Sequence, residues 1–185
     1  PSHNQSTFDP LGPVAANQLF IFNVIFWVAA VIFVAVEGAL IYMFVKFRRR
    51  PGDEDPKQVH GNTKLEIAWT VIPALILVIA AVPTIDGIFF AANPPPNPAG
   101  GPALEVDAIG RQWFFEFQYA DPNDPSKKVV FANELHMPVA EPVVFRLDSR
   151  DVIHSFWVPK LGGKVDMVPN NDHSLWLQAD DVGEF

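Results

Sequence analysis

The chain has 185 residues, of which 49% are hydrophobic and 18% charged, and its formal net charge is −8. Sixteen Phe and five Trp are more than a soluble domain of this length ordinarily needs, so the apolar and charged residues should be segregated along the chain. The acidic balance argues against nucleic acid as a partner, because phosphate binding needs a cationic surface. The absence of Cys excludes disulfides and thiolate metal ligands within these residues.

Two long apolar runs predict a transmembrane helical hairpin over residues 20–92. The first run is uncharged over residues 20–36 and the second over residues 67–85. Each run is long enough to cross, as a helix, the roughly 30 Å hydrocarbon core of a bilayer. A buried helical pair in a soluble protein is the alternative, but apolar runs of this length seldom occur in soluble cores.

The loop between the two runs indicates the orientation in the membrane. Residues 48–64 carry five Lys and Arg, whereas residues 1–18 carry none. The positive-inside rule therefore places this loop in the cytoplasm or matrix and both ends of the chain outside, with residues 1–19 as an external N-terminal segment. We expect an integral protein of a bacterial cell membrane or of the mitochondrial inner membrane.

Residues 93–102 are predicted to be a linker, because the sequence is rich in Pro and then in Gly and cannot sustain a helix. Residues 103–185 follow as a second domain, with short segments rich in Val, Phe, Ile and Trp between turn residues. Short strands at this spacing predict an all-β sandwich. Residues 93–185 carry seven basic and fourteen acidic side chains, so this acidic domain would attract a cationic protein partner.

Glu37 and Glu66 are candidate functional groups in the apolar runs. Charged side chains in a membrane are costly and usually face a partner or water. Glu37 is therefore expected to face protein. Glu66 lies at the cytoplasmic start of the second run, on the helical face that also carries Trp69 and Pro73. It is either a carboxylate that reaches the membrane interface or a group that handles protons or contacts another subunit.

Trp113 and His154 are the candidates in the β-domain, although neither is decisive alone. Trp113 begins an aromatic run, and such a run on a strand usually packs in a core. A lone His in a β-sandwich is more often structural than a metal ligand, and His136 and His173 have no partner at ligand spacing. These residues by themselves predict a membrane-anchored β-domain without defining an activity.

Several motifs, in the same order, make the chain resemble subunit II of haem-copper terminal oxidases. They are the helical hairpin, LEIAWTVIP at 65–73, GRQW at 110–113, and DVIHSFWVP at 151–159 followed by LGGKVD at 161–166. The likeness covers about residues 20–185. It implies a cupredoxin-like sandwich outside the membrane that accepts electrons from cytochrome c through a dinuclear copper centre. The electrons would pass to the haems of subunit I, where oxygen is reduced with coupled proton pumping.

The resemblance assigns three residues to electron transfer. His154 matches a histidine ligand of the dinuclear copper centre, and Trp113 matches the aromatic residue where electrons enter. Asp151 matches an acidic position of the surface that docks cytochrome c. Phe114 and Phe115 stand where the family often has a more polar aromatic pair.

Three further residues match positions at a proton pathway or at the interface with subunit I. Glu66 matches the carboxylate at the mouth of a proton pathway shared with subunit I. Lys164 and Asp166 match a polar pair at the subunit I interface. Other subunits and membrane lipid are thus implied as partners, and the chain itself holds no catalytic centre for oxygen chemistry.

The chain departs from the family pattern at the remaining copper ligands. In the family these come from a Cys-x-x-x-Cys segment followed by His and Met, which is absent here. His154 without thiolates cannot hold such a centre, so we expect a fragment that ends before the ligand loop and leaves the sandwich incomplete. A haem c would be present if a cytochrome domain followed residue 185.

Two alternatives account for the missing Cys in another way. The chain would be the copper-free subunit II of a quinol oxidase, or a membrane anchor subunit without redox activity. His154 and the stretch 164–169 resemble the copper-bearing branch, because quinol-type relatives usually lose this His and the Lys/Asp pair. The residues therefore favour the cytochrome c type.

Overall fold

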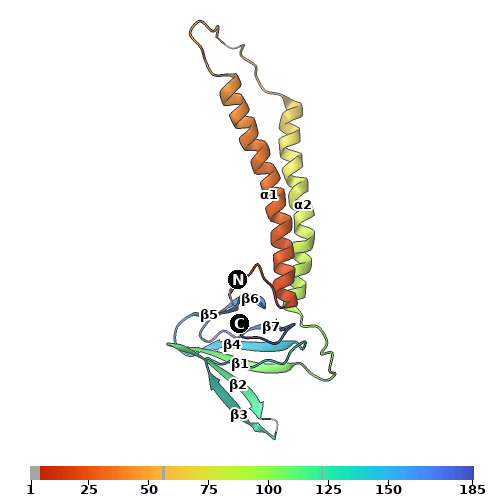
Figure 1. The fold of residues 1–185 in the computed structure, drawn as a ribbon, viewed down its shortest axis with the longest axis vertical. Helices are drawn as coiled ribbons and strands as arrows, with labels where there is room; N and C mark the ends of the chain where they lie inside the picture. Colours follow the sequence, from red (N-terminus) through yellow and green to blue (C-terminus); the bar gives the residue numbers. More distant parts are fainter. Residues whose placement is uncertain (1–4, 56, 122) are drawn as a thin grey trace. The chain divides into compact units, whose positions relative to one another are not determined.

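The computed structural model describes residues 5–55, 57–121 and 123–185. These residues form two compact units. One unit is Ile21–Ile85 and is helical apart from the loop between its helices. The other combines the described part of Pro1–Phe20 with Asp86–Phe185 and contains all the strands, and we call it the β-domain (Figure 1).

The two apolar runs form the helices α1, Pro13–Lys46, and α2, Thr63–Ala92. Pro suits the first position of α1, because that position needs no N–H donor. α2 continues through Pro73 and Pro83, as membrane helices tolerate. Each helix is long and apolar enough to cross a membrane, and none of the residues in its apolar window is buried within the chain. The prediction of two long apolar helices is confirmed, and lipid or other subunits fit their exposed apolar surface.

The strands form two sheets (Figure 1). They are β1 (Leu104–Arg111), β2 (Phe114–Asp121), β3 (Asp124–Ala132), β4 (Val143–Ser149), β5 (His154–Val158), β6 (Gly162–Met167) and β7 (His173–Leu177). The larger sheet has the order β3-β2-β1-β4-β7, with β1 and β4 parallel and the other neighbours antiparallel. β5 and β6 pair antiparallel in the smaller sheet.

The sequence pattern does not predict β6. Its two glycines are typical of a turn, and Lys164 and Asp166 interrupt its apolar character. In the structure both charged side chains lie on the exposed face of the strand, with Lys164 opposite Trp157 of β5. Met167 at the end of β6 is fully buried, so the strand contributes to the core although its apolar face is short.

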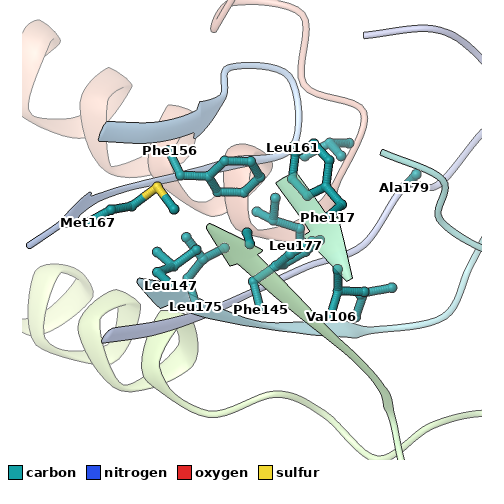
Figure 2. Close-up of a cluster of buried hydrophobic side chains, with 12 residues drawn as sticks. Val106, Phe117, Phe145, Leu147, Phe156, Leu161, Met167, Leu175, Leu177 and Ala179 are labelled. Carbon is teal, nitrogen blue, oxygen red and sulfur yellow. The ribbon is translucent and has the colours of Figure 1, made fainter. Parts of the chain in front are cut away.

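One hydrophobic core lies between the two sheets (Figure 2). Along β4 the buried side chains Phe145 and Leu147 alternate with the exposed Arg146, as a strand with one covered face requires. Phe156 of the smaller sheet packs with its ring centroid 5.4 Å from that of Phe145. The cluster also contains Val106, Phe117, Leu161, Met167, Leu175 and Leu177. The predicted β-sandwich is confirmed.

Within the β-domain, the segment before α1 is bonded to the regions around Lys160 and Asp180. The Leu11 N–H donates to the Lys160 carbonyl oxygen at 2.8 Å, and the Leu11 carbonyl oxygen accepts from the Asp180 N–H at 2.9 Å. The Lys160 side chain, only 6% exposed, donates to the Asp9 carboxylate at 2.8 Å. A buried ammonium needs such a partner. Part of the predicted separate segment over residues 1–19 therefore belongs to the β-domain, and α1 already begins at Pro13, ahead of the apolar run.

Candidate functional site

Trp113 lies in the tight turn between β1 and β2 and is 90% exposed. The next aromatic residues of the run behave differently, because Phe115 points inward. The Phe115 ring centroid lies 6.2 Å from that of His154 and 6.1 Å from that of Phe156. The expectation that an aromatic run packs in the core therefore holds for Phe115 and is wrong for Trp113. An exposed indole is free to contact a partner.

Asp151 lies in the loop between β4 and β5 and accepts three hydrogen bonds. The Gln112 N–H donates to Oδ2 at 2.6 Å, and the Val152 N–H donates to Oδ1 at 2.7 Å. The His154 Nε2 lies 2.6 Å from Oδ1. Three hydrogen bonds lower the pKa of Asp151 to about 2, and the bond from His154 has a larger effect than those from Gln112 and Val152. The carboxylate is therefore ionised at neutral pH.

The contact with Asp151 indicates which nitrogen of the His154 ring donates a hydrogen bond. An ionised carboxylate can only accept, so the Nε2 of His154 carries the proton in this hydrogen bond. In the neutral ring the Nδ1 atom then keeps its lone pair, which is the state that binds a metal ion. The structure thus brings together three of the predicted residues, Trp113 through its turn, Asp151 and His154.

Gly110 and Gln112 also belong to this site, although neither is predicted as a site residue from the sequence. A Cβ on Gly110 would lie 2.7 Å from Cδ2 and 2.8 Å from Cγ of His154, so the imidazole occupies the space that any larger residue would fill. The Gly110 carbonyl oxygen also accepts from the Arg150 N–H at 3.1 Å. A Gly near the end of a strand is a signal for such a close approach. Gln112 acts through its backbone, which no side-chain pattern reports.

Two family models match this chain. The family described as "Cytochrome C oxidase subunit II, transmembrane domain" matches residues 2–86, and "Cytochrome C oxidase subunit II, periplasmic domain" matches residues 123–185. The chain belongs to the cytochrome c oxidase subunit II family. It is a membrane protein of this family with two long apolar helices and a β-sandwich domain.

Relatives within the subunit II family carry two different names. Cytochrome c oxidase subunit 2 of Alkalihalophilus pseudofirmus is 42% identical over 98% of this chain and 52% of that protein. Quinol oxidase subunit 2 of Bacillus spizizenii is 34% identical over 98% of this chain and 56% of that protein. The chain thus spans about half the length of these curated relatives. Both names occur among the relatives, so membership of the family leaves the electron donor open.

A solved structure also resembles part of this subunit II chain. The crystal structure of the periplasmic domain of subunit II of cytochrome oxidase of Bradyrhizobium japonicum is 26% identical in sequence. The match covers 45% of this chain and 69% of that chain, with a TM-score of 0.40.

The subunit II family implies a copper centre, but the 185 residues do not contain a complete set of ligands for it. They contain no Cys, and His154 is the one ligand that the resemblance identifies. Within residues 5–55, 57–121 and 123–185, the structure has no group of three or more His, Cys, Asp or Glu side chains that could hold a metal ion. A copper site of this kind needs soft thiolate ligands. The donor set present therefore does not fit the centre.

Lys164 and Asp166 lie side by side on the exposed face of the β5–β6 hairpin of subunit II. The Lys164 Nζ lies 5.6 Å from the centroid of the Trp157 ring, a distance at which a cation is attracted to the π face. Ser155 Oγ donates to Asp166 Oδ1 at 2.5 Å. The pair and its two neighbours on β5 form an exposed polar and aromatic patch, which we call the hairpin patch.

Glu66 lies in the first turn of α2. The side chain of Asn62 caps this turn, because its Oδ1 accepts from the N–H groups of Lys64 at 3.1 Å and Leu65 at 3.3 Å. Glu66 reaches back, and its Oε1 accepts from the Asn62 N–H at 3.2 Å. Such reciprocal bonds stabilise a helix start. Glu66 thus stabilises the start of α2, besides its predicted role in proton transfer. Glu37, the other candidate carboxylate, lies on the exposed surface of α1.

Proposed function

We propose that the chain is part of subunit II of a respiratory oxidase that takes electrons from cytochrome c. The electrons are accepted at the exposed Trp113 and delivered to the haems of subunit I, where oxygen is reduced with coupled proton pumping. The observation that carries this proposal is the 90% exposed indole on a turn that Asp151 joins to His154. The oxidoreductase activity belongs to the assembled complex.

Two features support cytochrome c, rather than quinol, as the donor. The 42% identical relative over nearly the whole chain is named as a cytochrome c oxidase subunit. The net charge of −7 on residues 93–185 attracts a cationic protein, whereas a quinol dissolved in lipid gains nothing from it. The quinol oxidase alternative is supported by the absence of Cys and by the 34% identical relative.

His154 is proposed as one ligand of a dinuclear copper centre in the whole protein. Its Nδ1 is the atom left for a metal ion when Nε2 donates to Asp151. The thiolates would come from residues outside the 185 printed here, in keeping with relatives of about twice this length. When bound, such a centre supplies one-electron redox chemistry. Copper analysis and sequencing of the intact protein test this proposal, and a whole protein without two Cys would contradict it.

The remaining predicted residues receive roles in the complex. The hairpin patch with Lys164 and Asp166 is proposed to contact subunit I, because its exposed charges and indole suit a protein interface. Glu66 is proposed to lie at the mouth of a proton pathway. The loop 48–64 is assigned to the cytoplasm and the β-domain to the periplasmic or external side of a bacterial membrane, on the basis of the Lys and Arg distribution.

The donor is tested by measuring oxygen uptake of the purified oxidase with either reduced cytochrome c or a soluble quinol. We expect uptake with cytochrome c and a rate that falls as salt is raised, since the Debye length is about 10 Å at 0.1 M. Turnover with quinol alone would support the quinol oxidase alternative. A cytochrome c rate that does not change with salt would indicate a donor domain fused to the subunit.

A further inference from the structure

Asp151 joins two parts of the β-domain that are distant in sequence. Gln112 lies 39 residues before Asp151, and its N–H donates to the carboxylate at 2.6 Å. On the other side, Val152 in the loop before β5 and His154 at the first position of β5 donate to the same carboxylate. The carboxylate therefore bridges the turn that carries Trp113 and the strand that carries His154.

The loop around Asp151 is itself held in place. Ser149 is 4% exposed, and its hydroxyl donates to the Val152 carbonyl oxygen. The Arg150 N–H donates to the Gly110 carbonyl oxygen at 3.1 Å, which attaches the loop to the end of β1. Asp151 therefore meets Gln112 from a fixed position. A residue that orients another group must itself be held in place in this way.

The hydrogen bonds of Asp151 differ from those expected of a residue that only docks a partner. A docking carboxylate has its oxygens free to meet an incoming cation. Both oxygens of Asp151 are engaged by donors of this chain, and hydrogen bonds to a charged acceptor are stronger than neutral ones. By contrast, Asp148 at the end of β4 carries the same charge, but its carboxylate accepts from the adjacent Ser149 N–H at 2.7 Å and pairs with Arg150 at 3.4 Å, so these contacts stay within residues 148–150.

We propose that Asp151 is a positioning residue, whose carboxylate holds the Trp113 turn at a constant distance from the His154 ring. This inference rests on the proposed function, in which electrons are accepted at Trp113. Electron transfer slows steeply as the distance between donor and acceptor grows, so a turn that moves would lower the rate even with the partner bound. The docking role that the resemblance assigns to Asp151 predicts weaker binding instead.

The test compares three variants of the intact oxidase, Asp151→Ala, Asp151→Asn and Asp148→Asn. Asp151→Ala removes all three acceptor contacts, whereas Asp151→Asn keeps the shape and one acceptor oxygen. Asp148→Asn is the control for loss of one negative charge near the same loop. For each variant, the limiting rate and the KM for cytochrome c are measured, and hydrogen–deuterium exchange is followed in peptides that cover residues 110–115 and 150–155.

We expect Asp151→Ala to lower the limiting rate at least about tenfold, because small displacements of a positioned group have large effects on rate. Exchange should become faster in both peptides, and Asp151→Asn should lie between Asp151→Ala and the wild type. Asp148→Asn should change the limiting rate by less than about twofold, because its long, partly exposed pair with Arg150 contributes little and the Asn oxygen can still accept from the Ser149 N–H. Hydrogen–deuterium exchange of both peptides in Asp148→Asn should match that of the wild type.

Two results would overturn the inference. In the first, Asp151→Ala raises the KM for cytochrome c as much as Asp148→Asn does, while the limiting rate and the hydrogen–deuterium exchange stay unchanged. Asp151 is then a docking residue only. In the other, exchange becomes faster but the limiting rate stays within about twofold of the wild type, and the contact then serves the fold alone. A wild-type oxidase that does not oxidise cytochrome c would contradict the proposed function, and the exchange comparison would still show whether Asp151 holds the turn.

Discussion

The imidazole of His154 lies directly over the Cα of Gly110, where an added Cβ would be 2.7 Å from the ring. The ring cannot simply turn away from a larger residue, because its Nε2 is bound to Asp151 at 2.6 Å. Gly110 therefore determines how closely β5 approaches β1 at the site. This relationship links a backbone feature of one strand to the orientation of the candidate ligand on another.

The Gly110→Ala substitution should destabilise the β-domain. Overpacking of this kind costs about 1–3 kcal/mol in the free energy of unfolding, since either the ring or β1 must shift. Thermal unfolding of the purified protein measures the effect. Gly38→Ala is the control, because a Cβ there meets no atom within 4 Å. Equal stability of the two variants would show that the His154 ring moves without cost.

The Trp113→Ala substitution should leave stability nearly unchanged, within about 0.5 kcal/mol, because the side chain is exposed. The limiting rate of electron transfer from cytochrome c should fall much more than its binding weakens. Stopped-flow reduction of the assembled oxidase separates the two quantities. Trp157→Ala removes an indole from the hairpin patch and should leave the limiting rate per assembled complex unchanged. If binding and rate fall together, Trp113 is better interpreted as part of the docking contact.

The Glu66→Gln substitution should slow proton-coupled turnover while the complex still assembles. Gln retains an oxygen that can accept from the Asn62 N–H, so the start of α2 keeps its cap. Asn62→Ala is the complementary variant, since it removes the cap at a cost of about 0.5–2 kcal/mol and leaves the carboxylate. Turnover and assembly are measured for both variants. Normal turnover with lost assembly in Glu66→Gln would assign Glu66 a structural role only.

The topology predicts which segments a protease can reach. In sealed right-side-out vesicles, protease should remove the β-domain and leave the loop 48–64 intact, because Lys and Arg are retained on the cytoplasmic side. Immunoblotting with antibodies against each segment measures the outcome. Inside-out vesicles provide the control, in which the loop should be cut. Protection of the β-domain in right-side-out vesicles would contradict the assignment.

The sequence by itself determined the large-scale organisation, because the signals involved are local. Uninterrupted apolar runs predict the two long helices, and short apolar segments between turn residues predict the β-sandwich. The motifs around Trp113 and His154 indicated the family, which the comparisons confirm. β6 escaped prediction because Lys164 and Asp166 on its exposed face mask a strand whose apolar side is short.

Only the tertiary structure decided how the candidate residues meet. Trp113 and Phe115 look alike in the aromatic run, but Trp113 lies in the turn before β2 and is exposed, whereas Phe115 lies within β2 and packs against the core. The link from Gln112 to Asp151 spans 39 residues and uses a backbone N–H, which carries no sequence signature. Such contacts depend on where the ends of two strands lie relative to each other. This relative position is determined by the packing of the whole sandwich, so no local sequence pattern reports it.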